Sequence, residues 1–242
     1  SVMAGIADDL FDETILASSD KRVRRTTARI LINLANPTPN PVERHNALID
    51  AGILFPIRLY LTNKDFTLKT MGVTLAAMLA SSPSARIELG CQPELLRLLI
   101  NMCNPHDEEV NEWVAKALAE LAADSSNFDP IISCGGLNAL IYMICPRSKS
   151  KKVREDAVRC LASLSAHEVA KTRLTQSKAL GDLISISKSG PGLSKLYATA
   201  TLTNLEHDSA AIRIQTLYRG FASRRKERRR SISGGAEFTG FE

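Results

Sequence analysis

The chain has 242 residues, of which 44% are hydrophobic but only 5% aromatic, and its formal net charge at pH 7 is +5. A core built mostly from leucine, isoleucine, valine and alanine favours helices packed on helices over a β-sandwich, which draws on more aromatic and β-branched residues. No apolar run approaches the roughly 18 residues that a membrane-spanning helix needs.

The first segment, residues 1–19, is predicted to form a helix that caps the repeats described below. Its apolar side chains, Ile6, Leu10, Phe11, Ile15 and Leu16, have a spacing that a helix can place on one side. The chain begins at Ser1 instead of Met, so the import of a longer form into an organelle stays an open alternative.

Residues 20–206 contain one pattern five times, with a period of 41 to 45 residues. In each copy a leucine closes a helical segment, and mostly apolar or small residues stand three, seven and eleven positions before it. These offsets mark one face of a helix, so the pattern predicts five long helices. The closing leucines are Leu34, Leu79, Leu121, Leu164 and Leu205.

A second, shorter leucine-rich helix is predicted before each of the last four long helices, within residues 50–61, 90–102, 134–144 and 177–187. A glycine in each of these segments permits a sharp change of chain direction that a Cβ atom would hinder. Each unit therefore consists of a short helix, a turn, a second helix and a longer helix. No unit can bury its apolar face alone, so the units must stack.

The period, the turn and helix "DAGILFPIRLYL" and the long-helix pattern A-x-x-x-L-x-x-L resemble armadillo repeats over residues 20–206. The resemblance implies an all-α, right-handed α-solenoid of about 4–5 repeats, whose third helices line a concave groove that often binds extended peptides. HEAT repeats, which have a similar length but usually two helices, are the second alternative. Either fold predicts a protein-interaction scaffold and names no partner.

Peptide-binding armadillo proteins commonly place an asparagine just before the closing leucine. Here these positions hold Asn33, Met78, Glu120, Ser163 and Asn204, so only the two ends keep it. The tryptophan of the importin-α-like pattern, four residues earlier, is absent from all five copies, which disfavours a receptor for nuclear signals. Trp113 falls elsewhere on its helix and is predicted to be a core or rim residue.

The first long helix carries Arg22, Arg25 and Arg29 at helical spacing. Guanidinium groups match carboxylates well, so this stripe is a candidate site for an acidic segment of a partner protein. A solvated face whose arginines make ion pairs within the protein is the alternative, and the sequence leaves both open.

The sequence predicts no enzyme, no cofactor and no metal site. The four histidines are scattered, and neither a phosphate-binding glycine loop nor a nucleophile elbow is present. The acidic segment 104–109 is predicted to open a helix and not to bind a metal ion. Five cysteines, Cys91, Cys103, Cys134, Cys145 and Cys160, are predicted to be buried free thiols, which indicates the cytoplasm or another reducing compartment.

Residues 207–230 are predicted to form a basic amphipathic helix, because the segment from His207 onward holds eight Lys and Arg against four acidic residues. The stretch "IQTLYRGFASR" fits the pattern I-Q-x-x-x-R-G-x-x-x-R at Ile214, Gln215, Arg219, Gly220 and Arg224. It resembles an IQ motif, the helical target of calmodulin and related EF-hand proteins.

The chemistry of this segment agrees with the resemblance. An apolar stripe, suited to a hydrophobic groove, is flanked by arginines that match the acidic surround of an EF-hand lobe. The stripe consists of Ile214, Leu217, Tyr218 and Phe221, and its flanking arginines include Arg219, Arg224 and Arg225. The family resemblance further implies that the glutamine binds backbone groups of the partner and that calcium tunes the binding without being required for it.

Three alternatives stay open for residues 207–230. The helix docks on its own solenoid and closes the last repeat, it packs on a neighbouring subunit of a larger assembly, or it binds nucleic acid or an anionic membrane through "RRKERRR". Ser231 and Ser233 follow arginines as kinase sites often do, and phosphate there would weaken an acidic partner's binding. The remaining segment, residues 231–242, is predicted to be a flexible tail.

Overall fold

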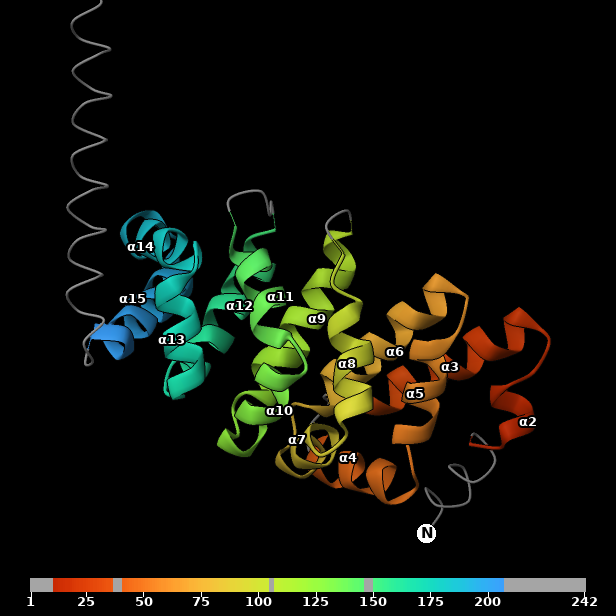
Figure 1. Ribbon diagram of the computed structural model, residues 1–242. Helices are drawn as coiled ribbons and strands as arrows, with labels where there is room; N and C mark the ends of the chain where they lie inside the picture. Colours follow the sequence, from red (N-terminus) through yellow and green to blue (C-terminus); the bar gives the residue numbers. More distant parts are fainter. Residues whose placement is uncertain (1–10, 37–40, 105–106, 146–149, 207–242) are drawn as a thin grey trace, which may run out of the picture.

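The computed structural model describes residues 11–36, 41–104, 107–145 and 150–206, and every element within these ranges is a helix (Figure 1). None of the described helices is both long and apolar enough to cross a membrane. The α-helices are α2 (Glu13–Leu16), α3 (Lys21–Ala35), α4 (Pro41–Asp50), α5 (Leu54–Thr62), α6 (Phe66–Leu79), α7 (Pro83–Gly90), α8 (Pro93–Asn101), α9 (Glu108–Leu121), α10 (Phe128–Ser133), α11 (Gly136–Ile144), α12 (Lys151–Leu164), α13 (Glu168–Gln176), α14 (Ala179–Ser189) and α15 (Gly192–Glu206).

The helices after α3 form four units of three, α4–α6, α7–α9, α10–α12 and α13–α15. The long helices α3, α6, α9, α12 and α15 each contact the next one, and they follow one another from right to left in Figure 1. One hydrophobic core runs through the stack from Leu16 to Leu205. The predicted all-α solenoid is therefore confirmed.

The helical faces predicted from the offsets are buried on α6, α9 and α12. At the position eleven residues before the closing leucine, Leu68, Val110 and Val153 are at most 1% exposed. The equivalent Val23 in α3 is 39% exposed, and the closing Leu34 is only partly buried. The difference arises because, among the described residues, only the four-residue α2 precedes α3.

The long helices begin where the chain supplies a side-chain cap. Asp20, Asp65, Asp107 and Ser150 accept a hydrogen bond from a backbone N–H in the first turn of α3, α6, α9 and α12. Such caps satisfy amide groups that have no partner within the helix. The acidic segment that was predicted to open a helix, residues 104–109, does so through Asp107.

Glycine makes two of the four predicted turns through a left-handed backbone. Gly52 before α5 has a φ of 88°, and Gly135 before α11 has a φ of 91°, a conformation that costs free energy for residues with a Cβ atom. Gly90 serves another purpose: it ends α7, and a Cβ atom there would lie 1.7 Å from the side-chain oxygen of Asn127. Gly181 lies inside α14 and makes no turn.

His45 makes the stability of the first complete unit depend on pH. The side chain is fully buried in α4, and its Nε2 donates to the carbonyl oxygen of Ala35 at 2.8 Å, while Nδ1 is buried with no hydrogen-bond partner among the described residues. Burial, and more weakly the charge of Arg44, lowers the pKa of His45 below its usual 6.5. Protonation would place a charge on a buried imidazole.

We therefore expect the free energy of unfolding to be fully maintained above pH 6.5 and to fall as the pH decreases below it, because the unfolded chain then binds a proton that the folded chain resists. Urea unfolding at pH 7.5, 6.5 and 5.5 measures this loss. His45→Gln keeps a donor for Ala35 but does not titrate, so its loss over the same range should be smaller. Equal losses in both proteins would assign the effect to other groups.

Candidate functional site

The exposed sides of the five long helices form one continuous surface, which we call the third-helix surface. Its polar side chains bond from one unit to the next with a recurring sequence separation. Arg25 bonds Asp65, Glu112 accepts from Ser150, Arg159 bonds Glu120, and Asn204 bonds Ser165, over separations of 38 to 40 residues. This separation is slightly less than one repeat, so each bond joins adjacent long helices.

Of the three arginines predicted as groove residues, Arg25 is paired within the protein, whereas Arg22 and Arg29 are exposed. Arg25 donates from Nε and Nη2 to both oxygens of Asp65 at 2.9 Å, and also to the hydroxyl of Thr67. The hydrogen bonds from Arg25 lower the pKa of Asp65. The charge of Arg25 is therefore neutralised within the protein, as the solvated-face alternative expects.

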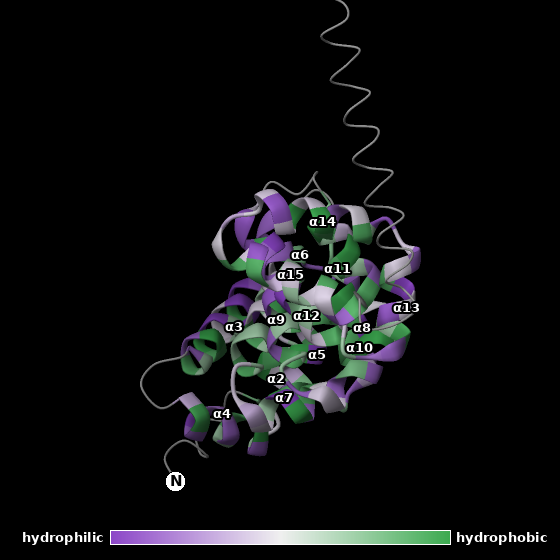
Figure 2. Ribbon diagram, turned by 90° about the vertical axis from the view of Figure 1, so that its left-hand side faces the viewer, coloured by the Kyte–Doolittle hydropathy of each residue, from purple (hydrophilic) through white to green (hydrophobic). Residues whose placement is uncertain are grey.

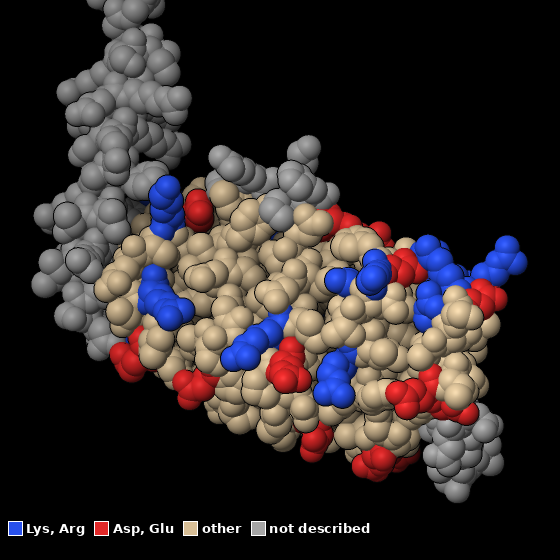
Figure 3. All heavy atoms as spheres, turned by 45° about the vertical axis from the view of Figure 1, so that its right-hand side comes forward, with Lys and Arg blue, Asp and Glu red and all other residues tan. Residues whose placement is uncertain are grey.

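Arg22 and Arg29 are exposed and form no ion pair with another described residue. Helix α3 contains five basic residues and no acidic one, and basic side chains gather at the α3 end of the molecule in Figure 3. The structure thus leaves two arginines of the predicted stripe available to a carboxylate-bearing partner.

The two predicted groove asparagines are used differently. Asn33 is exposed on α3 and has no side-chain hydrogen bond with another described residue. The amide of Asn204 donates to the Ser165 hydroxyl at 2.9 Å and to the Ala162 carbonyl at 3.4 Å. The NH2 group of Asn204 therefore closes the end of α12, whereas the side-chain amide of Asn33 has no such partner among the described residues.

The centre of the third-helix surface holds a charge network that was not predicted from the sequence. Glu120 lies between Arg159, at 2.9 Å, and Arg86, at 3.8 Å, and Arg159 also contacts Asp156 at 3.0 Å. Only 20% of the Glu120 side chain is exposed. Glu120 and Arg159 are 39 residues apart, within the range of 38 to 40 residues that the other bonds between units share. An acidic and a basic residue at this separation are the signal in the sequence that could have identified the pair.

Trp113 packs against the core from α9, as predicted for a core or rim residue, and carries two cations on its ring. The ammonium groups of Lys116 and Lys152 lie 5.3 and 5.8 Å from the ring centroid. Lys152 also lies 3.7 Å from Glu112, so this part of the surface pairs most of its charge internally.

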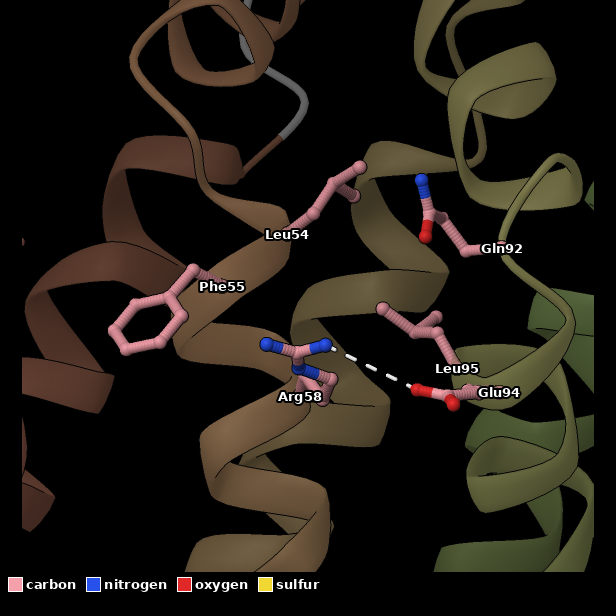
Figure 4. Close-up of a pocket in the computed structure, with 6 residues that line it drawn as sticks. All are labelled: Leu54, Phe55, Arg58, Gln92, Glu94 and Leu95. Carbon is pink, nitrogen blue, oxygen red and sulfur yellow. Dashed lines mark ion pairs between the residues drawn. The ribbon is translucent and has the colours of Figure 1, made fainter.

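A pocket of about 190 Å³ lies away from the third-helix surface, between α5 and α8 (Figure 4). Leu54, Phe55 and Leu95 supply its apolar walls, and Arg58 faces Glu94 across it at 3.9 Å. Both charged side chains are largely exposed, so water screens their attraction. The pocket contains no pair of groups arranged for acid–base chemistry.

The cysteines are free, but their burial differs from the prediction. Cys160 is buried, Cys103, Cys134 and Cys145 are partly buried, and Cys91 is exposed because it lies just beyond the end of α7. Burial raises the pKa of Cys103 to about 11, so this thiol is protonated at neutral pH. Within the described ranges, no three His, Cys, Asp or Glu side chains gather in a way that could hold a metal ion.

The residues predicted to bind an EF-hand protein, and the two predicted phosphorylation sites, lie outside the described residues. They are Ile214, Gln215, Leu217, Tyr218, Arg219, Gly220, Phe221, Arg224, Arg225, Ser231 and Ser233.

Comparison with known proteins supports the family at the level of one repeat and the fold over most of the chain. The sequence model of the Armadillo/beta-catenin-like repeat matches residues 124–166, which span α10 to α12. No curated protein shows a significant match to the chain.

Three solved structures illustrate the likeness. An engineered protein from a structural genomics consortium has a TM-score of 0.73 at 21% identity, covering 89% of this chain and 85% of that one. A designed armadillo repeat protein in complex with the peptide (KR)4 has a TM-score of 0.72 at 20% identity, covering 89% and 87%.

The third, a computationally designed armadillo repeat protein for modular peptide recognition, has a TM-score of 0.72 at 23% identity, covering 84% and 83%. The chain therefore has the armadillo-repeat solenoid fold, and one of its repeats, within residues 124–166, matches the sequence model of the armadillo repeat.

Proposed function

We propose that the protein is a non-catalytic adaptor that binds calmodulin or a related EF-hand protein through residues 210–225 and a second protein through the third-helix surface. The observation that carries the proposal is the fit of the IQ pattern at all five of its fixed positions, in a segment that directly follows a solenoid with the fold of designed peptide-binding proteins. The cysteines, all unpaired, support a reducing compartment such as the cytoplasm.

Calmodulin titration into the full chain tests the first half of the proposal. Calorimetry with calcium and with a chelator should detect binding in both conditions, with an affinity that calcium changes. Binding should weaken as salt increases, because arginines and acidic lobes attract each other across the interface. Absence of binding in both conditions would remove the EF-hand partner from the proposal.

The second partner is expected to be acidic where it meets α3. A designed armadillo repeat protein was solved in complex with the basic peptide (KR)4, but α3 here carries five bases and no acid, and Arg22 and Arg29 form no ion pair with another described residue. The exposed amide of Asn33, about one turn beyond Arg29, can bond the backbone of the same segment. Charge complementarity therefore favours a carboxylate-bearing peptide.

The peptide (DE)4 is expected to bind the protein more tightly than (KR)4 in fluorescence anisotropy at low salt. Arg22→Ala/Arg29→Ala should weaken (DE)4 binding about tenfold, the loss expected for two charge-assisted contacts on an exposed surface. Arg58→Ala, an exposed arginine of the pocket between α5 and α8, is the matched control and should leave the affinity unchanged. Tighter binding of (KR)4 would contradict the acidic partner.

A further inference from the structure

The last helix of the stack, α15, keeps open the face that would meet a sixth long helix. In the preceding long helices, the position six residues before the closing leucine is always buried and the position two residues before it is buried or partly buried, as expected for a face that meets the next unit. In α6 and α9 these residues are Val73, Ala77, Ala115 and Ala119, and all of them are buried. In α15 the equivalent residues are Thr199 and Thr203, and both are exposed.

Two apolar side chains lie beside this open face, at the positions of the third-helix surface that Arg22 and Arg25 hold in α3. Leu193 and Leu196 are 51% and 61% exposed, the two largest values among the large hydrophobic side chains in the described part of the chain. Ala200, one turn further, is also exposed. The hydroxyls of Thr199 and Thr203 donate to carbonyls of their own helix at 2.8 and 3.0 Å, so they need no outside partner.

We call these five residues, Leu193, Leu196, Thr199, Ala200 and Thr203, the terminal face. Figure 2 views the molecule from this end of the stack. Exposed leucines at helical spacing on the last unit of a solenoid are unusual, because terminal units normally carry polar side chains on the side that no neighbour covers.

The chain itself supplies a segment of matching length and chemistry. Helix α15 ends at Glu206, and an apolar stripe follows at Ile214, Leu217, Tyr218 and Phe221. Two antiparallel helices can be joined by a loop of about 2–5 residues, which here corresponds to residues 207–210. At a rise of about 1.5 Å per residue, Phe221 would lie about 16 Å along the returning helix.

By the same rise, Leu196 lies about 15 Å before the end of α15. Ile214, about 6 Å into the returning helix, would be level with Thr203. The part of the terminal face from Leu196 to Thr203 therefore matches the stripe from Ile214 to Phe221 in length, about 10 Å each, whereas Leu193 lies beyond Phe221.

We propose that the terminal face is the docking site of residues 210–221 of the same chain, so that this segment alternates between the end of the solenoid and an EF-hand protein. The regulatory part of this inference rests on the proposed function, because it assumes that the same stripe binds an EF-hand lobe. One set of apolar side chains cannot contact both surfaces at once.

Repulsion between like charges makes docking on the terminal face weaker than binding to an EF-hand protein. Lys195 is exposed beside Leu196, and the basic residues of the docking segment and its continuation include Arg213, Arg219 and Arg224. Like charges oppose docking, whereas the acidic lobes of an EF-hand protein favour capture. Salt should therefore strengthen docking and weaken calmodulin binding, two opposite dependences that separate the two interactions.

Trypsin cleavage of the full chain after Arg213 and Arg219 tests the docking without calmodulin. Leu193→Ser/Leu196→Ser removes the exposed leucines and should speed this cleavage about tenfold, the change expected if about 90% of the segment is docked. Ile30→Ser changes an equally apolar, 40% exposed residue at the opposite end of the stack and is the matched control. Both variants are surface substitutions, and circular dichroism verifies that each keeps its helices.

The same leucine variant should bind calmodulin about tenfold more tightly than the unchanged protein, because no docked state competes. Unchanged cleavage and affinity in this variant would overturn the docking, while intact calmodulin binding would leave the proposed function standing. Faster cleavage without any calmodulin binding would support the docking and refute the EF-hand partner. Protection that depends on protein concentration would assign the terminal face to a second copy of the chain and overturn the proposal.

Discussion

Replacing Gly90 by alanine is expected to lower the free energy of unfolding by about 3 kcal/mol, the upper range for overpacking a well-filled core. A Cβ atom at this position would lie 1.7 Å from Oδ1 and 2.4 Å from Cγ of Asn127. Asn127 is 2% exposed, and its amide nitrogen donates to the carbonyls of Leu121 and Arg86 at 2.9 and 3.1 Å. The side chain cannot move away without giving up both of these hydrogen bonds, which tie it to α9 and α7.

A double-mutant cycle separates the clash from other effects of the extra methyl group. Asn127→Ala alone should cost about 2 kcal/mol, because the Leu121 and Arg86 carbonyls lose a donor. In the Asn127→Ala background, Gly90→Ala has no side chain to displace and should cost less than about 1 kcal/mol. The difference from its cost in the unchanged protein is a large coupling energy between the two positions. Additive costs in urea unfolding would show that the contact with Asn127 is not what requires a glycine.

Ile214→Ala/Gln215→Ala is expected to weaken calmodulin binding at least about 100-fold, since truncating a central apolar anchor typically costs 2 kcal/mol or more and the amide contact adds to it. The measurement is calorimetry on the full chain with a calcium chelator present. The expectation follows from the IQ pattern. Ile214 is the first residue of the apolar stripe, and Gln215 is the one uncharged polar side chain at the five fixed positions.

The matched control for this variant keeps the stripe and reduces the charge. Arg228→Ala/Arg229→Ala lies beyond the pattern and should lower the affinity only a few-fold, through a weaker electrostatic attraction. If both double variants lose affinity equally, and RNA or anionic vesicles bind the chain regardless of Ile214 and Gln215, the segment acts as a general polyanion binder. That outcome would favour the nucleic-acid or membrane alternative.

The fold was predictable because its units are nearly identical in pattern. The offsets from Leu79, Leu121 and Leu164 predict which residues are buried on α6, α9 and α12, and the structure buries them. The prediction was less accurate at the start of the stack. Val23 and Leu34 satisfy the same pattern in α3, but in the described part of the chain only the short α2 precedes α3, so they remain partly exposed.

The candidate site was predictable only in part. The stripe of Arg22, Arg25 and Arg29 looks uniform in sequence, yet Asp65, one unit further, neutralises only Arg25. The groove positions Asn33 and Asn204 are likewise equivalent in the pattern, but only Asn204 has a neighbouring helix end, at Ser165, to bond. The ion-pair and hydrogen-bond partners of these residues lie about one repeat away in the sequence. The packing of adjacent units therefore decides which side chains are paired.

The sequence by itself determined the all-helical class, the repeat length, the five long helices and the IQ pattern, because each of these depends on residue spacing within one segment. Only the tertiary structure decided which charges remain unpaired, why Gly90 must lack a Cβ atom, and that Leu193 and Leu196 have no cover among the described residues. These properties depend on which neighbour a helix receives. In a stack of similar units, the neighbours differ most at the two ends, and there the candidate interaction surfaces lie.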